Sequence, residues 1–162
     1  NNEKAGCLLR AEKSNIPYKI ISQSDFREKN IFEYEIMKTL QNNDIELVVM
    51  AGWMKIVSSH FVSSFKNRII NIHPSLLPSF KGNKAIVEAI NNRSKITGCS
   101  VHFVESEVDS GSLIMQAALS ISDEDNIESL SKKIQILEHK ILPLSISKAG
   151  YLIRNKFKDK NL

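Results

Sequence analysis

The sequence has few cysteines, no long apolar run and no strong excess of charge, and each shortage excludes a class of protein. Only two of its 162 residues are cysteines, Cys7 and Cys99. Two cysteines in a chain of this size favour reduced thiols in a core over a disulfide framework. The longest apolar run, residues 47–54, has eight residues, whereas a membrane-spanning helix needs about 20. No charged segment followed by an apolar one opens the chain, so we predict a cytoplasmic protein.

Motifs for nucleic acids, common cofactors and metals are also missing. The 22 Lys and Arg residues exceed the 18 Asp and Glu residues by four. No basic stripe interleaved with aromatic residues accompanies this excess, so we expect no nucleic-acid partner and no membrane partner. A mild positive charge suits small anionic ligands. The sequence has no GxGxxG or Walker A motif and no cluster with metal-ligand spacing, so we predict no dinucleotide, ATP or metal site.

What the sequence does contain is the pattern of one α/β domain over residues 1–162. Its 42% hydrophobic and 25% charged residues are typical of globular proteins. Periodicity predicts helices at 4–13, 30–42, 58–65 and 84–92 and a long one after 125, and strands at 18–21, 47–51, 69–72, 100–104 and 113–121. This alternation predicts a mostly parallel, twisted sheet flanked by helices.

Local signals predict how two of the helices begin and how the last one is packed. Asn30 with Glu33, and Asp125 with Glu128, have the spacing of capping boxes. Pro143 interrupts the last helical pattern, so we expect a kink there. The apolar stripe expected to face the core consists of Ile127, Leu130, Ile134, Leu137, Ile141 and Leu144.

The order of elements has one unusual feature at its start. The pattern opens on a helix, whereas open α/β sheets usually open on a strand whose following turn binds the ligand. We therefore expect the first strand-helix-strand unit of the fold to be missing from this sequence.

Residues 71–78, NIHPSLLP, place two polar side chains at the end of a predicted buried strand. Asn71 and His73 are two residues apart, so their side chains project to the same side. Ligands of open α/β sheets bind at the carboxyl ends of the strands. A histidine can exchange a proton near neutral pH, and an asparagine amide can stabilise a developing oxyanion. Polar residues after a strand can equally cap a loop, so this pattern leaves a catalytic and a structural role open.

A second polar site is Asp109, followed by Ser110 and Gly111. A carboxylate beside a histidine favours the protonated imidazolium, and a glycine lets the backbone turn sharply. By itself, this sequence is also that of an ordinary turn.

Together these motifs resemble the formyltransferase superfamily that uses 10-formyltetrahydrofolate. The resemblance is carried by residues 71–78, 97–104 and 108–111. Residues 51–58 and 138–143 resemble the glycinamide ribonucleotide formyltransferase branch, and the similarity extends from residue 2 to about residue 150. This resemblance implies a Rossmann-like formyltransferase fold and an enzyme of purine biosynthesis that acts as a monomer or homodimer. It implies a formyl transfer from 10-formyltetrahydrofolate to the amine of glycinamide ribonucleotide.

The resemblance also implies roles for single residues. Asn71 polarises the formyl carbonyl and holds the oxyanion, and His73, as an imidazolium, stabilises that oxyanion and supplies a proton to the leaving amine. Asp109 keeps His73 charged and orders a water molecule. No acyl-enzyme is implied, which agrees with the lack of a serine or cysteine nucleophile motif.

Further residues are implied to bind the two substrates. The folate co-substrate is expected along Met54, Lys55, Ile56 and Val57, with Asn71 at its formyl group. Arg27 is expected at the glutamate tail of the folate, and Glu138 at the ribose hydroxyls of the ribonucleotide. The glycine- and serine-rich phosphate loop of the family has no counterpart in the sequence.

Other functions and other histidines complete the predictions. One alternative is a formyltetrahydrofolate deformylase, which passes the formyl group to water and shares the Asn-His-Asp trio. The other alternative is not an enzyme but a non-catalytic remnant that binds folate. Glu138 and residues 97–104 favour the transferase. We assign His60 and His102 to surface or packing roles. His139 can either orient Glu138, its neighbour in sequence, or pack.

Overall fold

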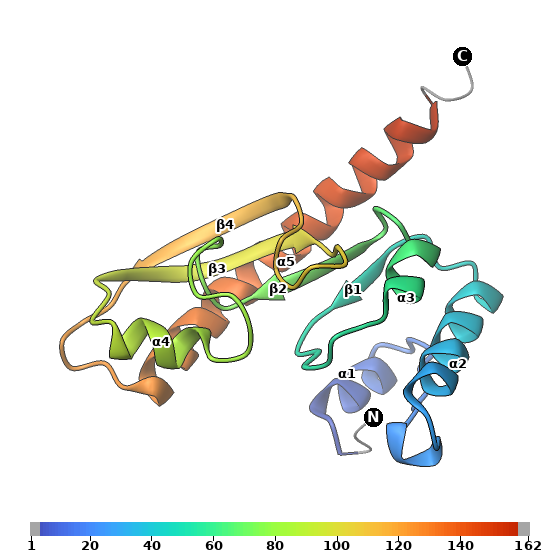
Figure 1. Ribbon diagram of the computed structural model, residues 1–162, viewed down its shortest axis with the longest axis horizontal. Helices are drawn as coiled ribbons and strands as arrows, with labels where there is room; N and C mark the ends of the chain where they lie inside the picture. The colour runs from blue at the N-terminus through green and yellow to red at the C-terminus, as the bar shows by residue number, and fades with distance from the viewer. Residues whose placement is uncertain (1–3, 159–162) are drawn as a thin grey trace. The chain divides into compact units, whose positions relative to one another are not determined.

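The computed structural model describes residues 4–158, which form two compact units (Figure 1). The first comprises Asn1–Ile45 and the second Glu46–Leu162. Each is described by itself, and a single domain over the whole chain stays a prediction. Within the described residues, no helix has the length and apolar character needed to span a membrane.

The first unit consists of α1 (Gly6–Lys13), the short 3₁₀ helix η1 (Gln23–Asp25) and α2 (Lys29–Asn42). The rings of Phe26 and Phe32 pack 5.8 Å apart, and Phe32 and Met37 are buried on α2. The strand predicted at 18–21 is wrong, because this segment is irregular. No other strand among the described residues of this unit offers it backbone partners, and an unpaired strand has no ladder to stabilise it.

The predicted cap of α2 is also wrong. The helix begins at Lys29 with Glu28 as its N-cap residue, and no side chain caps it. Asn30 therefore lies inside the first turn, where its Oδ1 accepts from the amide of Ile31 at 2.9 Å. Glu33 is buried and forms an ion pair with Lys29, four residues earlier, at 3.5 Å. Glu33, three positions after Asn30, thus forms an ion pair within the helix and is not part of a capping box.

The second unit is built on a four-stranded sheet in the order β1, β2, β3, β4. The strands are β1 (Val48–Met50), β2 (Ile69–His73), β3 (Ile96–Phe103) and β4 (Leu113–Ser120). The predicted α/β class with helices flanking the sheet is confirmed. β1 and β2 are parallel, but β2–β3 and β3–β4 are antiparallel, so parallel pairing is less extensive among these strands than we expected. The link between β3 and β4, residues 104–112, is shorter than the crossover that a parallel pair requires.

Three helices complete the second unit: α3 (Ser59–Ser64), α4 (Ala85–Asn91) and α5 (Ile127–Lys158). α5 runs along one face of the sheet and contacts β2, β3, β4 and α4 (Figure 1). The core between them contains Ile70, Ala89, Cys99, Val101, Ile114, Ile121, Leu130, Ile134, Ile141 and Ala149. Cys99 is in this core as predicted, whereas Cys7 on α1 is exposed, so the prediction of two core cysteines is half wrong.

The buried face of α5 differs from the predicted stripe at both ends. Ile127 is 48% exposed and Leu144 is 59% exposed. The helix continues through Pro143, and beyond it the buried residues are Ser145, Ala149 and Ile153, spaced by four. A helical turn takes 3.6 residues, whereas the predicted stripe has spacings that alternate between three and four and average about 3.5. Over several turns, the residues of such a stripe therefore rotate away from the buried face.

The predicted cap of α5 is displaced by one residue. Asn126 Oδ1 accepts from the amide of Ser129 at 2.9 Å, and the amide of Asn126 donates to Ser129 Oγ at 3.1 Å. This reciprocal pair is a capping box with serine in the place of glutamate. Asp125 instead accepts from the amide of Ser122 and from Lys133. These donors lower the pKa of Asp125 to about 2, led by Lys133.

Candidate active site

The site is built at the carboxyl end of β2. Asn71 lies in the last part of the strand and is paired with Met50 of β1 on one side and with His102 of β3 on the other. His73 ends the strand and is buried. The alternation of the strand places Asn71 and His73 on one face, and both line the same cavity.

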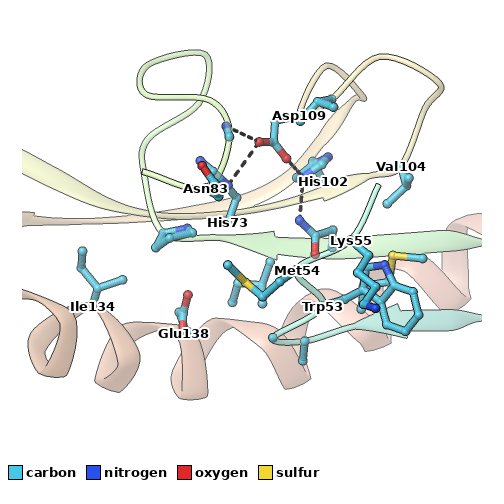
Figure 2. Close-up of a pocket in the computed structure, with 18 of the residues that line it drawn as sticks. Trp53, Met54, Lys55, His73, Asn83, His102, Val104, Asp109, Ile134 and Glu138 are labelled. Atoms are coloured by element: carbon cyan, nitrogen blue, oxygen red, sulfur yellow. Dashed lines mark hydrogen bonds and ion pairs between the residues drawn. The ribbon is translucent and has the colours of Figure 1, made fainter. Parts of the chain in front are cut away.

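The structure brings His73 and Asp109 together from distant parts of the chain (Figure 2). His73 Nδ1 lies 3.4 Å from Asp109 Oδ2, and both side chains are at most 10% exposed. The other ring nitrogen, Nε2, lies 2.8 Å from the carbonyl oxygen of Phe80. Both nitrogens of this ring therefore face acceptor oxygens, an arrangement that a doubly protonated imidazolium satisfies.

Backbone geometry holds Asp109 in place. Its Oδ2 also accepts from the amide of Gly82 at 2.8 Å, and its own φ is +49°, which an aspartate tolerates better than most residues. Two residues later, a Cβ on Gly111 would lie 1.8 Å from the carbonyl oxygen of Phe103. Only glycine lets the loop approach the end of β3 this closely, and this approach sets where Asp109 lies.

His102 is the site residue that the sequence analysis missed. Its Nε2 lies 3.5 Å from Asp109 Oδ1 and 3.4 Å from Asn71 Nδ2, and its Nδ1 lies 2.8 Å from the carbonyl oxygen of Phe103. Burial lowers the pKa of His102, and nearby His73 adds to the effect, while the Phe103 carbonyl and Asp109 oppose it. The alternation of apolar residues around it predicts packing. Only the antiparallel register, which puts it opposite Asn71, gives it another role.

The loop after His73 is fixed by one buried serine. Ser100 Oγ donates to the carbonyl of Ser75 at 2.6 Å and accepts from the amide of Leu77 at 3.0 Å and from Gln116 Nε2 at 2.8 Å. This hydroxyl thus uses its donor and both acceptor positions. The loop that it anchors, residues 74–80, carries the carbonyl of Phe80 that faces His73.

A cavity of about 1050 Å³ opens beside these residues. Residues 50–57 line one part of it, so the predicted Met54, Lys55, Ile56 and Val57 all face it, and α5 lines another with Ile134, Glu138 and His139. Met54 is 75% and Ile56 66% exposed, which makes them a wall open to a ligand rather than part of the core. A cavity of this size that combines apolar walls with converging polar side chains is typical of a small-molecule site.

Glu138 projects from α5 toward the ends of the strands (Figure 2). Burial raises its pKa, and the nearby His139 and His73 oppose this shift. Because the folded state then holds the proton more tightly than the unfolded state, this group lowers stability as the pH rises from its ordinary pKa of 4.5 through the raised value. A carboxylate kept in an unfavourable setting beside a cavity is a frequent sign of function.

Arg27 and Cys99 are not among the residues that line the cavity. Arg27 is exposed just before α2 in the first unit, and its contact with a folate tail remains a prediction. Among the described residues, no group of three or more His, Cys, Asp or Glu side chains is placed to hold a metal ion. Burial, to which Glu138 adds, raises the pKa of Cys99 to about 12, so Cys99 is no thiolate nucleophile at neutral pH.

Comparisons with known proteins assign the chain to a family. Residues 1–146 match the formyl transferase family. The chain belongs to this family. The resemblance predicted from its motifs is thereby confirmed.

Individual relatives of this formyl transferase chain agree in sequence and in structure. The trifunctional purine biosynthetic protein adenosine-3 of Bos taurus is 37% identical over 146 residues, which are 90% of this chain and 14% of the relative. Phosphoribosylglycinamide formyltransferase from Bacillus halodurans is similar in structure, with a TM-score of 0.86 and 36% identity over 94% of this chain and 77% of that one. The enzyme of the same name from Anaplasma phagocytophilum has a TM-score of 0.83 and 40% identity, covering 90% and 69%. The chain thus spans about a seventh of the multifunctional relatives.

Proposed function

We propose that this chain transfers the formyl group of 10-formyltetrahydrofolate to the primary amine of glycinamide ribonucleotide. The observation that carries the proposal is the convergence of Asn71, His73 and Asp109 at the edge of one large cavity. Membership of the formyl transferase family supports it. The relatives named phosphoribosylglycinamide formyltransferase support the choice of acceptor.

The three polar residues divide the chemistry according to what each can donate. Attack of the amine on the formyl carbon turns the carbonyl oxygen into an oxyanion, and Asn71 donates a hydrogen bond to it. His73, protonated and beside a carboxylate at 3.4 Å, adds a positive charge and delivers a proton to the departing folate nitrogen. The attacking amine loses a proton in the same reaction, and this proton returns to His73 through the water that Asp109 orders. Asp109 compensates that charge and orients the ring. No covalent enzyme intermediate is required, because the amine is itself the nucleophile.

The remaining lining residues suit the two ligands. The exposed apolar side chains of Met54 and Ile56, with Val57, offer a surface on which the flat rings of the folate can lie. Lys55 carries a positive charge for a carboxylate of its glutamate tail. Glu138, once ionised, accepts from the ribose hydroxyls of the ribonucleotide. The proposal includes a cytoplasmic location, no metal, and no nucleic-acid or membrane partner.

The test is to follow the absorbance change as 10-formyltetrahydrofolate is consumed, with and without glycinamide ribonucleotide. Consumption that requires the ribonucleotide and yields its formylated product supports the proposal. Equal consumption without the ribonucleotide would instead identify a hydrolase that passes the formyl group to water. Folate binding without any turnover would identify a non-catalytic binding protein. A variant with His60→Gln, at an exposed position on α3, is the control for unrelated histidine changes.

A further inference from the structure

His102 occupies the position between two of the three residues that the proposed chemistry uses. It is 2% exposed and lies directly opposite Asn71 in the pairing of β2 with β3. Its Nε2 is 3.4 Å from Asn71 Nδ2. The same nitrogen is 3.5 Å from Asp109 Oδ1, and Figure 2 shows His102 and Asp109 side by side. This one nitrogen therefore faces a donor on one side and an acceptor on the other.

The protonation of the other ring nitrogen, Nδ1, determines whether Nε2 donates or accepts a hydrogen bond. His102 Nδ1 lies 2.8 Å from the carbonyl oxygen of Phe103. A carbonyl oxygen can only accept, so Nδ1 carries a proton. Burial and the nearby His73 favour the neutral ring and lower the pKa of His102, against the opposing effects of the Phe103 carbonyl and Asp109. A neutral ring that is protonated at Nδ1 has a lone pair at Nε2 and can only accept there.

An acceptor at this point determines the orientation of the Asn71 amide. If the amide were turned by half a rotation, its oxygen would face the lone pair of Nε2, and two acceptors would oppose each other. With the NH2 group facing His102, one N–H is bound to the ring and the second remains to donate to a ligand in the cavity. Asp109 contacts His73 and the amide of Gly82 through Oδ2. Its Oδ1 lies 3.5 Å from His102 Nε2, which is the longer of the two contacts of that nitrogen.

We propose that His102 is a positioning residue that orients the side-chain amide of Asn71 by accepting a hydrogen bond from it at Nε2. The role deepens the proposed formyl transfer and rests on it, because it concerns the amide that donates to the oxyanion. His102 itself touches neither substrate in this proposal. It acts through Asn71.

The first experiment compares three variants of the full chain in the formyl-transfer assay. His102→Leu removes the acceptor and keeps an apolar side chain in the buried site, whereas His102→Gln keeps an amide oxygen that can accept. We expect His102→Leu to lower kcat by about 10- to 100-fold, up to the effect of removing one oxyanion donor, with both KM values changed less than about threefold. His102→Gln should recover most of the loss, and the exposed His60→Gln control should match the original chain. Equal losses in the Leu and Gln variants, both folded by their thermal unfolding, would contradict the proposal.

The second experiment separates a role through Asn71 from one through Asp109 or through packing. In an Asn71→Ala background, His102→Leu should cause no further loss of kcat, whereas in an Asp109→Asn background it should still lower kcat. Losses that multiply in the Asn71→Ala background would overturn the proposal.

A third measurement does not depend on turnover. Long-range proton–nitrogen NMR correlations of the original chain should show His102 protonated at Nδ1 and unprotonated at Nε2 at neutral pH. A proton at Nε2 would overturn the proposed orientation even if formyl transfer is confirmed. If the chain transfers no formyl group, the proposed function fails, while this spectrum still tests the orientation of Asn71.

Discussion

Replacing Asp109 by asparagine removes one negative charge and almost nothing else. The amide keeps the shape of the carboxyl group and an oxygen that can accept from Gly82. What it loses is the attraction for a protonated His73, 3.4 Å away. At an effective dielectric constant of about 20, two unit charges at that distance attract by about 5 kcal/mol. Because about 1.4 kcal/mol corresponds to a factor of ten in rate, we expect kcat to fall by about 10³- to 10⁴-fold.

The assay is ribonucleotide-dependent consumption of 10-formyltetrahydrofolate under saturating substrates. Both KM values should stay within about threefold, because the lost interaction matters most when the oxyanion forms. Asp123→Asn is the matched control, since Asp123 is an exposed aspartate that pairs with the exposed Lys95. A folded Asp109→Asn variant that retains kcat within about threefold of the original would refute the role of the charge.

Three further predictions concern stability and loop geometry. Glu138→Gln should raise the melting temperature at neutral pH, with the gain disappearing as the pH falls toward 4.5, because it removes a carboxylate whose pKa burial raises. The same variant should raise the KM for the ribonucleotide. Ser100→Ala should lower the free energy of unfolding in urea by about 1–3 kcal/mol, because two donors of the buried loop network lose their acceptor. Gly111→Ala should displace the loop of the catalytic carboxylate from the Phe103 carbonyl and abolish most activity, whereas Gly150→Ala, with open space around it on α5, should leave turnover unchanged.

Local patterns predicted the parts of the fold that depend on neighbours in sequence. Residues 69–72 are apolar and β-branched with one polar interruption, and they form β2. Ser58 caps α3 through its own side chain at the start of a segment expected to be helical. The run from Asn71 to His73 was recognisable because two polar side chains follow a buried strand, and their spacing puts them on one side.

Errors arose where a short signal had two structural uses. Asn30 and Asp125 each have an acidic residue three positions later. In the structure, however, Glu33 forms an ion pair with Lys29, and Asn126 rather than Asp125 caps the last helix. Residues 18–21 have strand-like composition but no partner strand within their unit among the described residues. The helix starts and the missing strand depend on alternative contacts of similar free energy. A local sequence pattern does not show which of these contacts is the more stable.

The sequence by itself determined the family, because its motifs combine residue types and spacings that chance rarely joins, and it determined which residue types could do the chemistry. Only the tertiary structure decided that Asp109 meets His73 and that His102 faces Asn71. The physical reason is that both contacts depend on the antiparallel direction and register of β3 against β2 and on a loop that glycine allows to approach β3 closely. A change of register by one residue would turn His102 to the other face of the sheet, and no local property of its sequence neighbours specifies that register.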